Sequence, residues 1–202
     1  MSYRQCKRML DALASAVLTF LLAPLLIVIS LAVLTMDGPP IFFRQQRLGC
    51  KGKVFTIFKF RTMVNGADQL LEKEYKNATG KRVTRLGRIL RTTSLDELPQ
   101  IVNILRGEMS FIGPRPALPA HLPRYTSIQR RRLEVLPGIT GLAQVRGRNN
   151  IRWTRRIRYD IFYIDHMGFA LDAMILFETV IKVISAEGMV LDRNPEKVDD
   201  LG

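Results

Sequence analysis

Two adjacent carboxylates, Asp96 and Glu97, lie in a part of the chain that is otherwise rich in arginine. Carboxylates among cations suit two kinds of chemistry: they bind a divalent cation, or one of them attacks a phosphorus atom whose charge the cations offset. A structural interpretation also exists, because Ser94 and Glu97 have the spacing of a helix capping box. Pro99 fits that box poorly and suits the first turn of a helix, which puts both carboxylates just ahead of a helix N-terminus.

Arg115 is the second candidate for chemistry, since it stands between two prolines in the tetrapeptide GPRP at 113–116. Flanking prolines fix the backbone, which lowers the entropy lost when the planar guanidinium binds a diphosphate through two hydrogen bonds. A polyproline turn with a solvated arginine is the alternative. The chain contains neither a P-loop nor a dinucleotide-binding fingerprint.

The composition predicts a polyanionic partner. The 202 residues include 31 Lys and Arg against 18 Asp and Glu, a formal net charge of +13. Anionic lipid headgroups, a phosphorylated substrate and nucleic acid can all bind a protein with this positive charge. Many of the lysines and arginines lie beside an apolar segment, which favours the first two partners. Cys6 and Cys50 have no metal or redox spacing and are interpreted as free thiols. His121 and His166 are isolated, so we expect no zinc site.

An uncharged run of 25 residues separates Asp11 from Asp37, with Pro24 at its centre. About 20 apolar residues suffice to cross a bilayer as a helix, and the proline must kink or break such a helix near Phe20. Basic residues flank both ends of the run, which the positive-inside rule assigns to one side of the membrane. They are Arg4, Lys7, Arg8, Arg44, Arg47, Lys51, Lys53, Lys59 and Arg61.

These residues leave two alternatives open. A kinked helix spans the bilayer, or a re-entrant helix enters one leaflet, turns near Pro24 and returns to the same face. The re-entrant form requires partners for the carbonyls freed at the kink, and Ser30, Thr19 or water are the candidates.

The rest of the chain predicts an α+β fold that is mainly helical. Aromatic and β-branched residues predict a small β-hairpin over 41–48 and 54–63, with its turn at 49–53. The proline-rich segment 113–123 is expected to be an extended loop, and the polar tail after Asp192 to be frayed. A short polar helix is predicted over 67–76, and further helices over 83–91, 98–105, 128–135, 153–165 and 169–185.

Two of these helices carry further expectations. The segment 153–165 has apolar residues on one face and arginines around it, which suits an amphipathic helix at the membrane interface. The alternative is a helix that packs this face on a soluble core. The segment 169–185 is strongly apolar with a narrow polar stripe, so we expect it to be buried.

Four motifs in order resemble the bacterial sugar transferase family, in particular the small monotopic phosphoglycosyl transferases. They are KFRTM at 59–63, RTTSLDELPQ at 91–100, MSFIGPRP at 109–116 and PGITGLAQ at 137–144. The resemblance implies transfer of a sugar 1-phosphate from a UDP-sugar to undecaprenyl phosphate, giving a polyprenyl diphosphate sugar and UMP, as the first membrane step of glycoconjugate synthesis.

The resemblance also implies roles for particular residues. Asp96 is the expected nucleophile and Mg²⁺ ligand, and Glu97 completes the catalytic dyad. The cations expected near the phosphates are Lys59, Arg61, Arg91 and Arg115. The family commonly has Ser-Pro at the membrane break where this chain has Ala23-Pro24, so the help that this serine gives to the kink must come from elsewhere.

The resemblance favours the re-entrant alternative and a three-part organisation. We expect a re-entrant membrane helix with its flank at 1–38, a catalytic domain at 39–192 and a polar tail at 193–202. The active site is then on the cytoplasmic face of the bacterial inner membrane, in contact with anionic headgroups and without a nucleic-acid partner. The sequence leaves the sugar, the pathway and the choice between monomer and homodimer open.

A function of another class also accounts for the charge. A non-catalytic, membrane-tethered basic protein would bind anionic lipid or nucleic acid. It gives no reason for Asp96 and Glu97 to lie among cations. Release of UMP from a UDP-sugar distinguishes the two functions.

Overall fold

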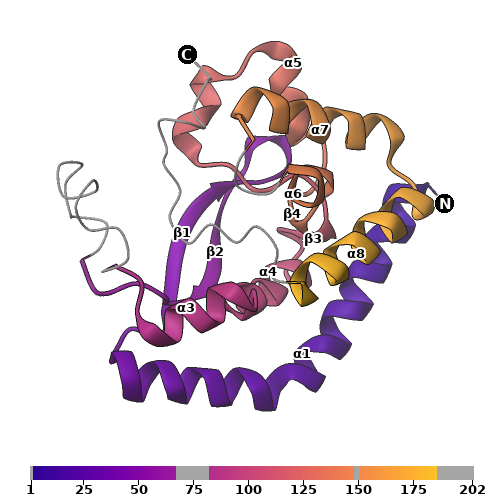
Figure 1. Ribbon diagram of the computed structural model, residues 1–202. Helices are drawn as coiled ribbons and strands as arrows, with labels where there is room; N and C mark the ends of the chain where they lie inside the picture. The colour runs from indigo at the N-terminus through magenta and orange to yellow at the C-terminus, as the bar shows by residue number, and fades with distance from the viewer. Residues whose placement is uncertain (1, 67–81, 148–150, 186–202) are drawn as a thin grey trace.

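The computed structural model describes residues 2–66, 82–147 and 151–185. The helix predicted over 67–76 and the tail after Asp192 lie outside these residues. The fold is α+β and mainly helical, as the sequence predicts, with a long N-terminal helix beside a mixed domain (Figure 1).

The α-helices are α1 (Tyr3–Asp37), α3 (Arg85–Thr92), α4 (Ile101–Leu105), α5 (Ser127–Arg130), α6 (Leu142–Gly147), α7 (Trp153–His166) and α8 (Phe169–Ile184). The strands are β1 (Phe42–Leu48), β2 (Val54–Phe60), β3 (Ser110–Ile112) and β4 (Gly138–Thr140). Short 3₁₀ turns are η1 (Cys50–Gly52), η2 (Leu95–Gln100), η3 (Pro119–Arg124) and η4 (Arg131–Leu133).

Helix α1 bends in its middle, so its two halves run in different directions (Figure 1). Pro24 lies inside the helix, where it removes one backbone donor and crowds the carbonyl of Phe20. The expectation that Ser30 or Thr19 satisfies the freed carbonyl is wrong. Their hydroxyls donate to the carbonyls of Leu26 and Ser15, each at 2.7 Å, one turn back along the helix.

The N-terminal half of α1 is bonded to the start of α8 by a buried polar cluster, the N-terminal anchor. The Asp172 carboxylate accepts hydrogen bonds from the Tyr3 hydroxyl at 2.6 Å and the Tyr163 hydroxyl at 2.9 Å. It also forms an ion pair with the ammonium group of Lys7 at 2.7 Å. Because Asp172 is only 8% exposed, these three partners offset the free-energy cost of burying its carboxylate.

The C-terminal end of α1 is bonded to the same domain by a second set of contacts, the C-terminal anchor. Arg61, just after β2, donates to the backbone carbonyls of Asp37 at 2.6 Å and Pro39 at 3.0 Å. The Thr84 hydroxyl donates to the Asp37 carboxylate at 2.8 Å. The last carbonyls of a helix have no partner within the helix, and an arginine there also complements the helix dipole.

The predicted hairpin is confirmed. β1 and β2 are antiparallel, with Phe42 opposite Phe60 and Leu48 opposite Val54, although β2 ends at Phe60 and not at residue 63. Asn103 of α4 bonds to β2 and is fully buried. It accepts from the backbone N–H of Phe58 at 3.3 Å and donates to the carbonyl of Thr56 at 2.8 Å.

A parallel pair of strands that the sequence did not predict joins β3 to β4, with Ser110 opposite Gly138. The two backbones approach closely, since a Cβ atom on Gly138 would lie 2.1 Å from the amide nitrogen of Gly113. The extended loop predicted over 113–123 is correct only at its start, because Pro119–Arg124 form the turn η3. The helix predicted over 128–135 is α5 followed by η4.

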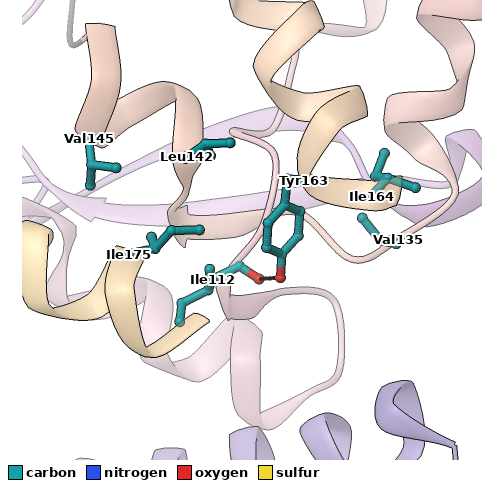
Figure 2. Packing of buried hydrophobic residues seen from close by; sticks show 7 residues of the cluster. All are labelled: Ile112, Val135, Leu142, Val145, Tyr163, Ile164 and Ile175. Atoms are coloured by element: carbon teal, nitrogen blue, oxygen red, sulfur yellow. Dashed lines mark hydrogen bonds between the residues drawn. The ribbon is translucent and has the colours of Figure 1, made fainter. Parts of the chain in front are cut away.

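The largest apolar cluster joins β3, α6, α7 and α8 (Figure 2). The Tyr163 hydroxyl donates to the carbonyl of Ile112 at 3.3 Å within it. Helix α7 packs its apolar face on the core, with Ile157 and Ile164 buried. The alternative interpretation is therefore confirmed: this apolar face packs on the protein core and is not available to lipid.

Helix α8 is not buried as expected. Only Asp172 and Ile175 are buried, while the outer side exposes a row of large apolar side chains. They are Phe169, Leu176, Phe177, Val180, Ile181 and Ile184. Helix α1 exposes apolar side chains in the same way over most of its length, and among the described residues it is the helix long and apolar enough to cross a membrane.

Replacement of Asp172 tests the N-terminal anchor. Asp172→Asn keeps the volume and removes the nearer of the two buried counter-charges of Lys7, which leaves the Asp11 carboxylate at 4.0 Å, so it should lower the free energy of unfolding by up to about 3–5 kcal/mol. Denaturant unfolding in detergent micelles measures this change. The matched control is Asp165→Asn, which breaks an exposed pair with Arg131 and should cost less than about 1 kcal/mol. Equal effects of the two substitutions would show that the anchor does not hold α1.

Candidate active site

Asp96 and Glu97 lie inside the 3₁₀ turn η2, not ahead of a helix that begins at Pro99. The capping-box interpretation is wrong, because Ser94 makes no side-chain capping bond. Ser94 adopts the left-handed conformation, with φ of 59° and ψ of 13°. A residue other than glycine pays a steric cost in this region, and such residues cluster at functional sites. The turn therefore holds the dyad in a geometry that local preference alone does not favour.

Glu97 is held between two cations. Its Oε1 atom accepts a hydrogen bond from the Arg115 guanidinium at 2.9 Å and another from the Lys59 ammonium of β2. Burial raises the pKa of Glu97, but Arg115 and Lys59 outweigh it and hold the pKa well below its usual range. Burial lowers the pKa of Lys59, and the charge of Glu97 opposes that change. Glu97 therefore stays ionised and fixes the positions of both cations.

Asp96 differs from its neighbour in having no hydrogen-bond donor among the described residues. Burial, followed by the charge of Glu97, raises the pKa of Asp96 to about 6, against the opposing effect of Lys59, Arg91 and Arg115. At neutral pH this side chain is a carboxylate whose lone pairs accept no hydrogen bond from any residue that the structure describes. Such a group can bind a metal ion or attack an electrophile.

Arg91 reaches the site from the last turn of α3. Its Nε atom donates to the Thr62 hydroxyl at 2.8 Å. Helix α3 can lie this close to Thr62 because residue 87 is glycine: a Cβ atom there would lie 2.2 Å from the carbonyl oxygen of Thr62.

Arg115 is positioned by a buried ion pair that the sequence did not predict. The Arg132 guanidinium donates to the backbone carbonyl of Arg115 at 2.9 Å and pairs with Asp160 at 2.8 Å. It also donates to the Tyr125 hydroxyl at 2.6 Å. The side chains of Arg132 and Asp160 are 1% and 2% exposed. Arg132 stands in the basic run 130–132, where nothing in the local pattern distinguishes it from its exposed neighbours.

The fourth predicted cation, Arg61, is near the site but its guanidinium is bonded to backbone carbonyls at the end of α1. Arg61 lines the same cleft as the dyad. The structure thus brings Lys59, Arg91 and Arg115 together around the dyad, and it places Arg61 at the junction between this site and the C-terminal anchor.

A cleft of about 900 Å³ contains the dyad and these four cations. The hairpin forms one wall, with Arg44 and Arg47 of β1, and the segments around α6 and α8 form another. At the α8 end the lining residues are Thr140, Gln144, Thr179, Lys182 and Val183. This volume is within the range of small-molecule sites.

The residues present fit a magnesium ion held jointly by the protein and substrate phosphates. Among the described residues, no group of three or more His, Cys, Asp and Glu side chains could hold a metal by itself. Mg²⁺ is usually bound through one or two carboxylates together with phosphate oxygens and water. Asp96 offers such a carboxylate, whereas the Oε1 atom of Glu97 is engaged by two cations.

The dyad rests on the C-terminal half of α1. A buried apolar cluster lies between them, with partly buried side chains from α1, α3 and η2 packed around it. Its buried members are Ile29, Val33, Phe60 and Leu90, and its partly buried members are Leu26, Ile41, Leu86, Leu95 and Leu98. Leu95 and Leu98 flank the dyad within η2, so the position of the carboxylates depends directly on α1.

Comparison with known proteins gives consistent matches over almost the whole chain. An uncharacterized sugar transferase of Bacillus subtilis, EpsL, is 44% identical, covering 91% of this chain and 89% of the relative. The exopolysaccharide production protein ExoY of Rhizobium meliloti is 38% identical, covering 90% of this chain and 87% of the relative. The UDP-glucose:undecaprenyl-phosphate glucose-1-phosphate transferase of Caulobacter vibrioides is 41% identical, covering 90% of this chain and 70% of the relative. The family described as bacterial sugar transferase matches residues 2–186, and this chain belongs to that family.

Proposed function

We propose that this protein transfers a sugar 1-phosphate from a UDP-sugar to undecaprenyl phosphate, through a covalent intermediate on Asp96. The names of relatives such as the Caulobacter vibrioides enzyme support the reaction class. The observation that carries the mechanism is the contrast within the dyad. Glu97 is bonded to two cations, whereas Asp96 beside it accepts no hydrogen bond from a described residue and has a pKa raised to about 6.

In the first step an oxygen of the Asp96 carboxylate attacks the β-phosphorus of the UDP-sugar. A bond forms between this oxygen and phosphorus, and the bond from phosphorus to the oxygen that bridges to UMP breaks. UMP leaves with the electron pair, and the sugar phosphate remains on Asp96 as an acyl phosphate. Lys59, Arg91 and Arg115 surround the reacting phosphates and offset their charge, so the attack of one anion on another is not prevented by repulsion.

In the second step a phosphate oxygen of undecaprenyl phosphate attacks the same phosphorus. The bond to Asp96 breaks, the carboxylate is restored and the polyprenyl diphosphate sugar is released. Asp96 is the nucleophile of the first step and the leaving group of the second. A carboxylate that accepts no hydrogen bond from a described residue and is not strongly basic suits both steps. Mg²⁺, held by Asp96 together with substrate phosphates, supplies charge stabilisation when it is bound.

We also propose that α1 is re-entrant and that the site faces the cytoplasm, where UDP-sugars are made. The support for this topology is that both anchors bond α1 to one domain, at Asp172 and at Arg61. A helix with both ends on one domain cannot place its ends on opposite sides of a bilayer. Non-catalytic binding of anionic lipid is the weaker alternative, because it gives no role to a carboxylate dyad enclosed by cations.

Removal of the nucleophile tests the covalent role. Asp96→Asn should abolish turnover and the transfer of label from a UDP-sugar that carries ³²P in its β-phosphate to the protein. The fold should survive: burial raises the pKa of the wild-type carboxylate, so above about pH 6 its charge lowers stability, and asparagine removes that charge. We therefore expect a Tm no lower than that of the wild type at pH 7.5. A stably folded variant that keeps a tenth of the activity would exclude the covalent role.

The pH dependence of the first step follows from the same pKa. The nucleophile must be ionised, so the single-turnover rate of UMP release should fall tenfold per pH unit below about pH 6. The measurement is made without undecaprenyl phosphate, because a phosphate monoester itself titrates near pH 6. In Glu97→Gln this acidic limb should move to lower pH, since the charge that raises the pKa of Asp96 is lost. A rate that is constant from pH 7 to pH 5 would contradict this assignment.

The role of Arg115 is tested by a substitution that keeps its charge. Arg115→Lys removes the planar fork, so kcat/KM for the UDP-sugar should fall on the order of 10-fold or more. Arg85→Lys, at an exposed position of α3, is the matched control and should leave kcat/KM unchanged. If lysine at position 115 is equivalent to arginine, Arg115 contributes only to the general positive field.

A further inference from the structure

Helix α8 separates the cleft from the exposed apolar surface of the molecule. Thr179, Lys182 and Val183 line the cleft, and their spacing of three and four residues puts them on one side of the helix. On the other side Phe177 is 66% exposed and Ile184 is 80% exposed. One helix therefore carries a polar stripe on the active-site cleft and a large apolar face outside it.

The polar stripe is held in place by contacts with its neighbours. The hydroxyls of Thr179 and Thr140 of β4 are 2.7 Å apart, and Thr179 also donates to the carbonyl of Ile175 at 2.7 Å. Arg146 of α6 pairs with Glu178 at 3.0 Å. These contacts fix this end of α8 against the cleft, with two hydroxyls and the lysine at position 182 along its lining.

The apolar face of α8 is continuous with that of α1. The two helices lie side by side near their N-termini (Figure 1), where the rings of Tyr3 and Phe169 are in edge contact at 4.9 Å. An apolar surface of this extent on two neighbouring helices fits contact with lipid chains. The outer face of α8 and the exposed part of α1 then meet the same bilayer.

An acceptor with a phosphate head and a long hydrocarbon chain has two incompatible requirements. Its phosphate must reach Asp96 in a cleft lined by arginines, while its long chain exceeds what a cleft of about 900 Å³ can hold and stays in the lipid. Of the described helices that line the cleft, α8 presents both environments, one on each side. The ammonium group of Lys182 is a donor of the kind that binds a phosphate monoester. The Thr140 hydroxyl donates to Thr179 and the Thr179 hydroxyl donates to the carbonyl of Ile175, so both threonines hold this part of α8 against the cleft.

We propose that Lys182 binds the phosphate of the polyprenyl phosphate acceptor, that Thr140 and Thr179 position this part of α8 at the cleft, and that the outer face of α8 keeps the acceptor's chain in the bilayer. This inference rests on the proposed function. It divides the cleft between the substrates: the donor diphosphate occupies the end with Arg91 and Arg115, and the acceptor phosphate approaches Asp96 from the α8 end.

The two half-reactions separate acceptor binding from donor binding. In Lys182→Ala the KM for undecaprenyl phosphate should rise on the order of 10-fold, the loss of one charge-assisted hydrogen bond. Single-turnover UMP release in the absence of acceptor should stay within about twofold of the wild type. Thr179→Val keeps the shape of the side chain and should change the KM for undecaprenyl phosphate in the same direction by a smaller factor. Lys53→Ala, in the exposed hairpin turn, is the control.

The outcomes distinguish this inference from the proposed function. If Lys182→Ala slows UMP release and leaves the KM for undecaprenyl phosphate unchanged, the lysine binds the donor and the inference is wrong. If neither Lys182→Ala nor Thr179→Val changes the KM for the acceptor, the acceptor binds elsewhere, although the proposed function stands. If the wild-type protein releases no UMP from any of a panel of UDP-sugars, the proposed function itself fails.

The apolar face is tested with two acceptors of different chain length. The double variant Phe177→Ser/Ile184→Ser should raise the KM for undecaprenyl phosphate in phosphatidylglycerol vesicles. It should not change the KM for a short, water-soluble polyprenyl phosphate, whose chain needs no bilayer. An equal effect on both acceptors would show that the outer face of α8 does not deliver the lipid chain.

Discussion

The attachment of α1 to one domain at both of its ends is the constraint on which the rest of the structure depends. At one end Asp172 is bonded to Tyr3 and Lys7, and at the other Arg61 is bonded to the carbonyl of Asp37. A straight helix of this length could not meet both sets of contacts on the same domain, and the bend associated with Pro24 reconciles them. The described helix that is long and apolar enough to cross a membrane is therefore bonded at both of its ends to the polar domain.

The packing of α1 against the domain also determines the position of the candidate active site. Ile29 and Val33 of α1 pack in one cluster with Leu95 and Leu98, the two residues that flank the dyad. Lys59, which bonds to Glu97, directly precedes Phe60 of that cluster. The position of α1 and the position of the carboxylates are thus set by one packing arrangement, which in the proposed topology links the active site to the depth of α1 in the bilayer. An interfacial reaction between a water-soluble sugar nucleotide and a lipid phosphate needs such a link.

The sequence predicted the parts of this structure that depend on local patterns, and it failed where distant contacts or the solvent decide. Alternating aromatic and β-branched residues predicted the hairpin. The charge pattern around Asp96 and Glu97 selected two carboxylates that the structure places in one cleft with Lys59, Arg91 and Arg115. The pairing of Ser110 with Gly138 and the ion pair between Arg132 and Asp160 join segments that are far apart in the chain. Helix α8 was expected to be buried because its composition is that of a core helix. An apolar composition does not show whether the apolar surroundings are a protein core or lipid.

Accessibility of the N-terminus of α1, and of the hairpin turn in the domain that follows α1, to a membrane-impermeant thiol reagent tests the central claim most directly. The variants are Ser2→Cys and Lys53→Cys, each in a background in which Cys6 and Cys50 are replaced by serine. If α1 is re-entrant, neither cysteine reacts in intact bacterial cells, and both react in inverted membrane vesicles that expose the cytoplasmic face. Reaction of Ser2→Cys in intact cells, with Lys53→Cys still protected, would show that α1 spans the bilayer and would contradict the account.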